Sequence, residues 1–109
     1  MRRGYWLKKR VIRAILSGQY DIRVHPIRLI WRHKHCYGYC LDEVAHVDPR
    51  RGGSPVWTLV HEMLHLLYPN ASEKWVTKRA DLLFPRMTYR EVKVVERFIA
   101  RKYREWRAR

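Results

Sequence analysis

The stretch HEMLH, residues 61–65, has two histidines and a glutamate at the spacing that a catalytic metal site requires. On a helix, His61 and His65 lie one turn apart, so both imidazoles leave the same face and can reach one metal ion. Glu62, beside the first histidine, can reach a metal-bound water and take its proton. Zinc lowers the pKa of that water to about 7, which makes hydroxide available near neutral pH. The pattern predicts one zinc ion with Glu62 as general base.

The alternative to a metal site is a buried helix with two incidental histidines, and the residues that flank HEMLH help to decide between the two. Residues 56–67 are mostly apolar, and Ser54-Pro55 provides a helix cap followed by a first-turn proline. A helix that is apolar nearly all round is buried, and polar side chains within it need partners. The flanks therefore favour metal binding.

The longer stretch HEMLHLLYPNASEKW, residues 61–75, resembles the active-site segment of the SprT-like and YgjP-like zinc metallopeptidases. In those families an HExxH helix is followed by a short Pro-Asn turn and a helix rich in aromatic residues. The upstream YGYCLDEVAHVDP resembles the edge strand that precedes the active-site helix of zincin proteases. The resemblance covers about residues 38–85, and it implies a zincin-like fold and zinc-dependent hydrolysis of peptide bonds.

In the YgjP-like pattern a histidine directly follows the Asn and supplies the third zinc ligand. This sequence has Ala71 at that position, so the third ligand must be another residue. Glu73 lies in the first turn of the next helix and borders its inward apolar face, whereas Asp81 projects roughly opposite. A glutamate on a following helix also resembles the gluzincins, and LLFP at residues 82–85 is similar to the LLMP of ImmA/IrrE-like proteins. We expect Glu73 to be the third ligand. The alternative is a first-turn carboxylate favoured by the helix dipole.

Peptide hydrolysis also needs a group that stabilises the oxyanion, and the sequence does not separate three candidates: His46, Tyr68 and Tyr89. In zincins the substrate lies as an added strand against the edge strand above the metal. The resemblance places that strand at residues 41–47.

The stretch HKHCYGYC invites a second zinc site. Its four potential ligands are His33, His35, Cys36 and Cys40. In an extended strand His33 and His35 face away from Cys36, so the four converge only if the chain folds back at residues 37–39. A plain hairpin with reduced thiols is the alternative.

Periodicity and capping residues predict the elements that position these side chains. Apolar residues at helical spacing predict a first helix, closed by Gly18, and a capping box of Thr88 and Glu91 begins the last one. The expected helices span residues 5–16, 55–67, 73–84 and 89–107. Interleaved apolar and basic residues predict strands at about residues 20–25, 27–34 and 38–47. The order predicts an α+β fold: an N-terminal helix, a small, mostly antiparallel sheet, the HExxH helix and two C-terminal helices.

The chain is strongly basic, with 24 Lys and Arg against 10 Asp and Glu in 109 residues and a formal net charge of +14. Such a charge attracts polyanions, although a solvated surface is the alternative. On the last helix one stripe is basic: Arg90, Lys93, Arg97, Arg101 and Arg104. The opposite stripe is expected to face the core: Val95, Phe98, Ile99, Tyr103 and Trp106. A polyanion such as DNA or RNA would relieve the repulsion within the basic stripe.

These features predict a single-domain zinc metallopeptidase over residues 1–109, acting on peptide or protein substrates. By resemblance to SprT-like proteases, the basic surface would direct it to proteins bound to nucleic acid. The alternative is a basic nucleic-acid-binding module with a structural or degenerate zinc site. An enzyme kept latent by its own C-terminus is a third reading. Without an apolar leader or an apolar run of about 20 residues, we expect a cytoplasmic monomer with no membrane contact.

Overall fold

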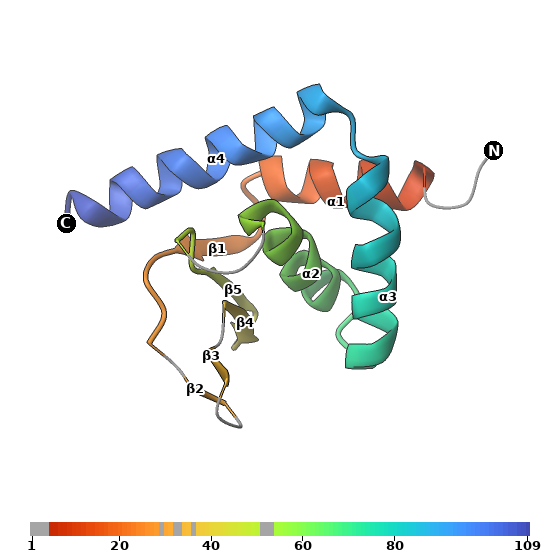
Figure 1. Cartoon of the computed structure of the whole chain (residues 1–109), viewed down its shortest axis with the longest axis horizontal. Coiled ribbons are helices and arrows are strands. Elements are labelled where there is room, and N and C mark those ends of the chain that lie inside the picture. Colours follow the sequence, from red (N-terminus) through yellow and green to blue (C-terminus); the bar gives the residue numbers. More distant parts are fainter. Residues whose placement is uncertain (1–4, 29, 32–33, 36, 51–53) are drawn as a thin grey trace.

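The computed structural model describes residues 5–28, 30–31, 34–35, 37–50 and 54–109. Its helices are α1 (Tyr5–Leu16), α2 (Pro55–Leu67), α3 (Glu73–Leu83) and α4 (Tyr89–Arg107), with a 3-10 turn η1 (Phe84–Arg86) between the last two. Its strands are β1 (Asp21–Val24), β2 (Ile30–Trp31), β3 (Lys34–His35), β4 (Gly38–Leu41) and β5 (Val44–Val47). Figure 1 shows their arrangement, which confirms the predicted α+β fold class.

The main sheet has the strand order β1-β5-β4, and β2 pairs with β3 in a separate antiparallel ribbon. Strand β5 is antiparallel to β4 but parallel to β1, a pairing that was not predicted. The single strand expected at residues 38–47 was wrong, because the chain reverses at Asp42 and Glu43, whose φ angles are 52° and 63°. The expected edge strand at residues 41–47 was wrong for the same reason: β5 lies inside the sheet and β4 at its edge.

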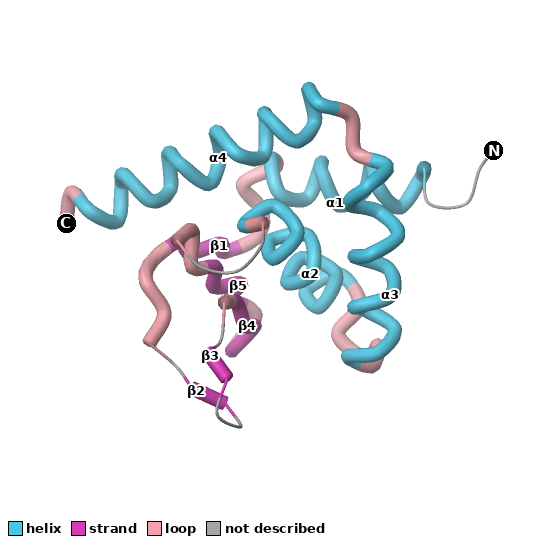
Figure 2. The backbone as a smooth tube through the Cα atoms, in the orientation of Figure 1, coloured by secondary structure: helices cyan, strands magenta, loops and turns pink. Residues whose placement is uncertain are grey.

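Helix α2 lies between the sheet and α3, with α1 behind it and α4 along one side (Figures 1 and 2). Side chains alternate across a strand, so Ala45 and Val47 of β5 are buried against α2 while His46 points to the other face. Apolar residues from the helices and the main sheet share one core. Its largest fully buried members include Ile15, Leu59, Met63, Leu64 and Leu83.

Capping residues begin the helices at the predicted positions. The Ser54 hydroxyl accepts a hydrogen bond from the Trp57 amide, and the Ser72 hydroxyl accepts one from Trp75. The capping box of Thr88 and Glu91 is present in full. Helix α3 ends at Leu83 rather than at residue 84, because the chain tightens into η1 around Pro85.

Helix α4 extends beyond the core at its C-terminal end. Val95, Phe98 and Ile99 are buried as expected, but Trp106 is 41% exposed, so its assignment to the core-facing stripe was wrong. Four residues of the basic stripe are exposed: Arg90, Arg97, Arg101 and Arg104. Lys93 is partly buried and pairs with Glu96 at 3.2 Å. Among the described residues, no helix is long and apolar enough to cross a membrane.

Glu91 joins the first and last helices. Its carboxylate lies 3.0 Å from the ammonium groups of both Lys8 and Lys9 and accepts a hydrogen bond from the Thr88 amide at 2.8 Å. Burial raises the pKa of Glu91, but these hydrogen bonds and charges outweigh it and lower the pKa to about 2 from a usual 4.5. The ionised carboxylate therefore stabilises the fold at neutral pH.

Replacing Glu91 tests this connection. Because the folded-state pKa is depressed, the stabilisation is present above pH 4.5 and lost as the pH falls toward 2. Glu91→Gln should lower the free energy of unfolding at pH 7 by about 1–2 kcal/mol and flatten its pH dependence in that window. Denaturant unfolding followed by circular dichroism measures both effects. The exposed control Glu96→Gln should change little, and equal acid sensitivity in Glu91→Gln and wild type would contradict the account.

Candidate metal centre

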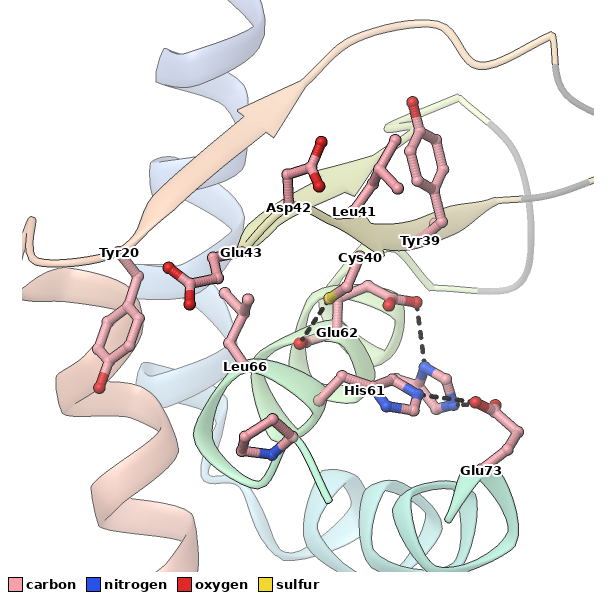
Figure 3. Close-up of a pocket in the computed structure, with 13 residues that line it drawn as sticks. Tyr20, Tyr39, Cys40, Leu41, Asp42, Glu43, His61, Glu62, Leu66 and Glu73 are labelled. Carbon is pink, nitrogen blue, oxygen red and sulfur yellow. Dashed lines mark hydrogen bonds and ion pairs between the residues drawn. The ribbon is translucent and has the colours of Figure 1, made fainter. Parts of the chain in front are cut away.

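His61, His65 and Glu73 form a group that could hold a metal ion, and their ligand atoms lie within 4.8 Å of one another. Both histidines turn Nε2 toward the same carboxylate: His61 Nε2 lies 2.7 Å from Glu73 Oε1, and His65 Nε2 lies 2.7 Å from Glu73 Oε2. Figure 3 shows Glu73 beside His61. Ligands of one tetrahedral zinc ion lie about 3.3 Å apart, given bonds of about 2.0–2.1 Å. The two separations of 2.7 Å are shorter than that value and no ligand pair is more than 4.8 Å apart, so small side-chain movements would let the three hold one ion.

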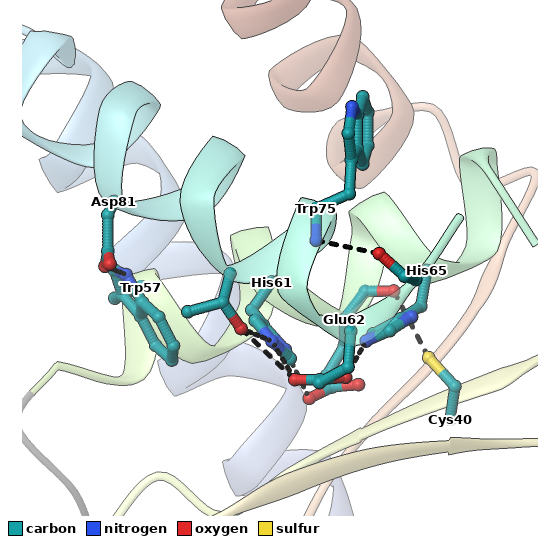
Figure 4. Close-up of polar contacts among 10 residues, drawn as sticks. Cys40, Trp57, His61, Glu62, His65, Trp75 and Asp81 are labelled. Carbon is teal, nitrogen blue, oxygen red and sulfur yellow. Dashed lines mark hydrogen bonds and ion pairs between the residues drawn. The ribbon is translucent and has the colours of Figure 1, made fainter.

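Contacts around His61 fix its ring. Nδ1 lies 3.1 Å from Glu62 Oε2, so a proton on Nδ1 leaves the lone pair of Nε2 for a metal ion. Trp57 stacks on the imidazole with ring centroids 5.0 Å apart, and its own indole N–H donates to Asp81 at 2.9 Å (Figure 4). Thr77 Oγ1 lies 3.2 Å from His61 Nε2 and donates to Glu73 Oε1 at 3.3 Å. Helix α3 therefore orients both the buried histidine and the exposed carboxylate.

Strand β4 closes over Glu62, which is only 4% exposed. A Cβ atom at Gly38 would lie 2.5 Å from Thr58 Cγ2 and 3.2 Å from Glu62 Oε2, so only glycine allows this approach. The Cys40 thiol donates to the backbone carbonyl oxygen of Glu62 at 3.2 Å. Burial, and then the negative charge of Glu62, raise the pKa of this thiol far above its usual value, so Cys40 stays protonated.

Electrostatics within the group favour opposite charges on Glu73 and His61. Burial lowers the pKa of His61, but the hydrogen bonds and charges of Glu62 and Glu73 outweigh it and raise the pKa. Burial raises the pKa of Glu73, but the charges of His61 and His65 outweigh it and lower the pKa. The carboxylate is therefore ready to pair with a cation.

The group opens into a pocket of about 690 Å³ between α2, the start of α3 and the β4–β5 hairpin. Glu62, His61 and His65 line it, and Glu73 stands at one end with a side chain 67% exposed. Solvent and a ligand can therefore reach the histidine nitrogens from this side.

Comparisons with protein-family models, with curated proteins and with solved structures give no match. The resemblance to zincin peptidases therefore stays a prediction.

The predicted site residues divide into two sets. His61, Glu62, His65 and Glu73 come together as expected. The candidate oxyanion stabilisers do not join them: among the described residues that line the pocket, His46, Tyr68 and Tyr89 do not occur. Each of these three side chains lies in another part of the structure.

His46 lies on the opposite face of the sheet, where its Nδ1 is 2.9 Å from Nε2 of His25. The Tyr68 hydroxyl accepts a hydrogen bond from Arg10 at 3.2 Å, and Tyr89 is exposed at the start of α4. Two other tyrosines, Tyr20 and Tyr39, line the pocket instead.

The suggested second metal group is only partly visible. His33 and Cys36 lie outside the described residues, so that hypothesis stays untested.

The C-terminal residue Arg109 lines a separate groove with Trp106 and His46, on the other side of the sheet from the pocket. The sequence analysis did not identify the contacts of Thr77, although its position one helical turn after Glu73 indicates them. It treated Gly38 only as a turn residue and did not predict its close approach to α2.

Two carboxylates on α3 provide a matched pair for testing the metal group. Glu73→Gln should weaken binding of Zn²⁺ or Co²⁺ by about 100-fold or more, because it removes one ligand of three. Asp81→Asn on the same helix removes the same charge but keeps a side-chain oxygen that can accept from the Trp57 indole, so it should leave the affinity nearly unchanged. Titration with a competing chelator measures both. Equal affinities in the two variants would exclude Glu73 as a ligand.

The close approach of β4 to α2 is testable by a double substitution. Gly38→Ala should lower the free energy of unfolding by about 1–3 kcal/mol, because the new Cβ meets Thr58 Cγ2 and the carbonyl oxygen of His46. Thr58→Ser removes the contacting methyl group and keeps the hydroxyl. The double variant should recover part of the loss in thermal unfolding. A Gly38→Ala protein as stable as wild type would refute this account of the glycine.

Proposed function

We propose that this protein is a zinc-dependent metallopeptidase. The observation that carries the proposal is the convergence of His61, His65 and Glu73 in a pocket that also contains the carboxylate of Glu62. Three protein ligands leave a further coordination position for water or substrate, as in catalytic zinc sites, whereas structural sites have four protein ligands. Two imidazoles and one carboxylate are a donor set that suits zinc.

A zinc ion held by His61, His65 and Glu73 would lower the pKa of a bound water and polarise the carbonyl group of the peptide. The other steps fall to side chains of the protein. Glu62 takes a proton from water through its carboxylate and delivers it to the nitrogen of the leaving amine. A carboxylate has two oxygens, so the contact of Oε2 with His61 leaves Oε1 to accept that proton. The low exposure of Glu62 keeps bulk water from competing for it.

The edge strand β4 supports binding of an extended peptide beside the metal group. Among the described residues, β4 pairs with β5 and lies at an edge of the sheet, and Cys40 and Leu41 of this strand line the pocket. A peptide added as a further strand would bond to backbone groups along the outer edge of β4. The proposed peptide site is therefore strand β4 and not residues 41–47, as expected from the sequence.

A basic nucleic-acid-binding module with a structural or degenerate metal site is the second candidate function. The exposed arginines of α4 favour it, because Arg90, Arg97, Arg101 and Arg104 lie at helical spacing on one side of the helix in a chain with net charge +14. The same face would direct a peptidase to proteins held on DNA or RNA. The number of protein ligands on the metal separates the two candidates.

Glu62 provides the test. Glu62→Gln should still bind zinc, because the residue is not a ligand and the glutamine oxygen can accept from His61 Nδ1 as the carboxylate does, and it should lower kcat for peptide hydrolysis by about 10²–10⁴-fold. Mass spectrometry of cleaved casein or of the protein itself, with metal analysis of the same samples, measures both properties. Glu96→Gln on α4 serves as the control and should keep full activity. Zinc-loaded wild type that cleaves no peptide, or a Glu62→Gln protein with wild-type activity, would contradict the peptidase function.

A further inference from the structure

The metal pocket is acidic although the chain is strongly basic. Four carboxylate residues line it: Asp42, Glu43, Glu62 and Glu73. Among the described residues that line the pocket there is no Lys or Arg. The whole chain has 10 acidic residues against 24 Lys and Arg, so composition alone would place basic side chains here too. The local charge is opposite in sign to that of the protein.

Two of the four carboxylates have no part in the metal group. Asp42 and Glu43 form the turn between β4 and β5, both are exposed, and neither has an ion pair with a described residue. Four carboxylates elsewhere in the chain pair with Lys or Arg: Asp21, Asp48, Glu91 and Glu96. Asp42 and Glu43 are thus available to a cation from outside.

The two turn residues lie at one end of the pocket. In Figure 3, Glu43 points toward the space between Tyr20 and Leu66, while Glu73 lies at the opposite end beyond Glu62 and His61. A divalent metal ion held at Glu73 offsets two of the four negative charges. The remaining negative charge then lies at the Asp42 and Glu43 end, beside the path of a peptide along β4.

We propose that the pocket selects peptides with a Lys or Arg side chain close to the bond that is cut, and that Asp42 and Glu43 bind this side chain. The inference rests on the peptidase function proposed above. Charge complementarity at a rim adds modest affinity but strong discrimination, because a like charge is repelled. The net charge of the whole chain, +14, repels cations, so a preference for a cationic peptide would point to the acidic pocket.

Binding can be measured without catalysis in the Glu62→Gln background with zinc. Three peptides with an uncharged fluorophore differ only at two central residues, which are Lys, Gln or Glu, and fluorescence anisotropy gives Kd. We expect the Lys peptide to bind about three- to tenfold more tightly than the Gln peptide, and the Glu peptide to bind most weakly. Adding Asp42→Asn and Glu43→Gln should remove most of this difference. Adding the control pair Asp81→Asn and Glu96→Gln, which changes the net charge equally, should retain it.

The opposite results would overturn the inference: Gln or Glu peptides that bind as tightly as the Lys peptide, or a preference unchanged by the Asp42 and Glu43 substitutions. Hydrolysis of the same three peptides by zinc-loaded wild type separates this from the proposed function. Hydrolysis with no charge preference would leave the peptidase function standing and refute the inference. A Lys preference in binding with no hydrolysis of any peptide would instead refute the peptidase function.

Discussion

Helix α2 carries His61 and Glu62 into the interior, where only 8% and 4% of their surfaces are exposed. Buried polar groups cost free energy unless they are paired, so the surrounding elements must supply partners as well as apolar contacts. Helix α3 supplies Glu73 and Thr77 to His61, and strand β4 approaches α2 closely enough that Gly38 is required. The positions of α3 and β4 therefore depend both on these contacts with polar side chains of α2 and on apolar packing.

The same contacts set the charges of the metal group. His61 Nε2 lies 2.7 Å from Glu73 Oε1, and the raised pKa of His61 and lowered pKa of Glu73 favour a cationic imidazole beside an anionic carboxylate. A metal ion would take the place of the proton on Nε2 and contact the same carboxylate and imidazoles. The exposed side of Glu73 would give the ion a route from solvent.

Much of the fold and of the metal group followed from local sequence. Ser54, Ser72 and Thr88 cap helices where predicted. Helical spacing indicated His61 and His65, and the place of Glu73 in its helix, with a resemblance to gluzincins, indicated the third member of the group. The β4–β5 hairpin was not predicted, because two-residue turns with positive φ favour Asn and Gly, whereas Asp42 and Glu43 form this turn. The parallel pairing of β1 with β5 and the placement of the three oxyanion candidates depend on contacts between distant segments, which local patterns do not reveal.

The coordination of the bound metal tests the central claim most directly. X-ray absorption at the zinc edge of the zinc-loaded protein distinguishes nitrogen and oxygen ligands at about 2.0–2.1 Å from a sulfur ligand at about 2.3 Å. The account predicts one zinc per chain with two imidazoles, one carboxylate and one oxygen from solvent, and loss of the carboxylate and of tight binding in Glu73→Gln. A sulfur ligand, four ligands from the protein, or the absence of stoichiometric zinc would contradict it.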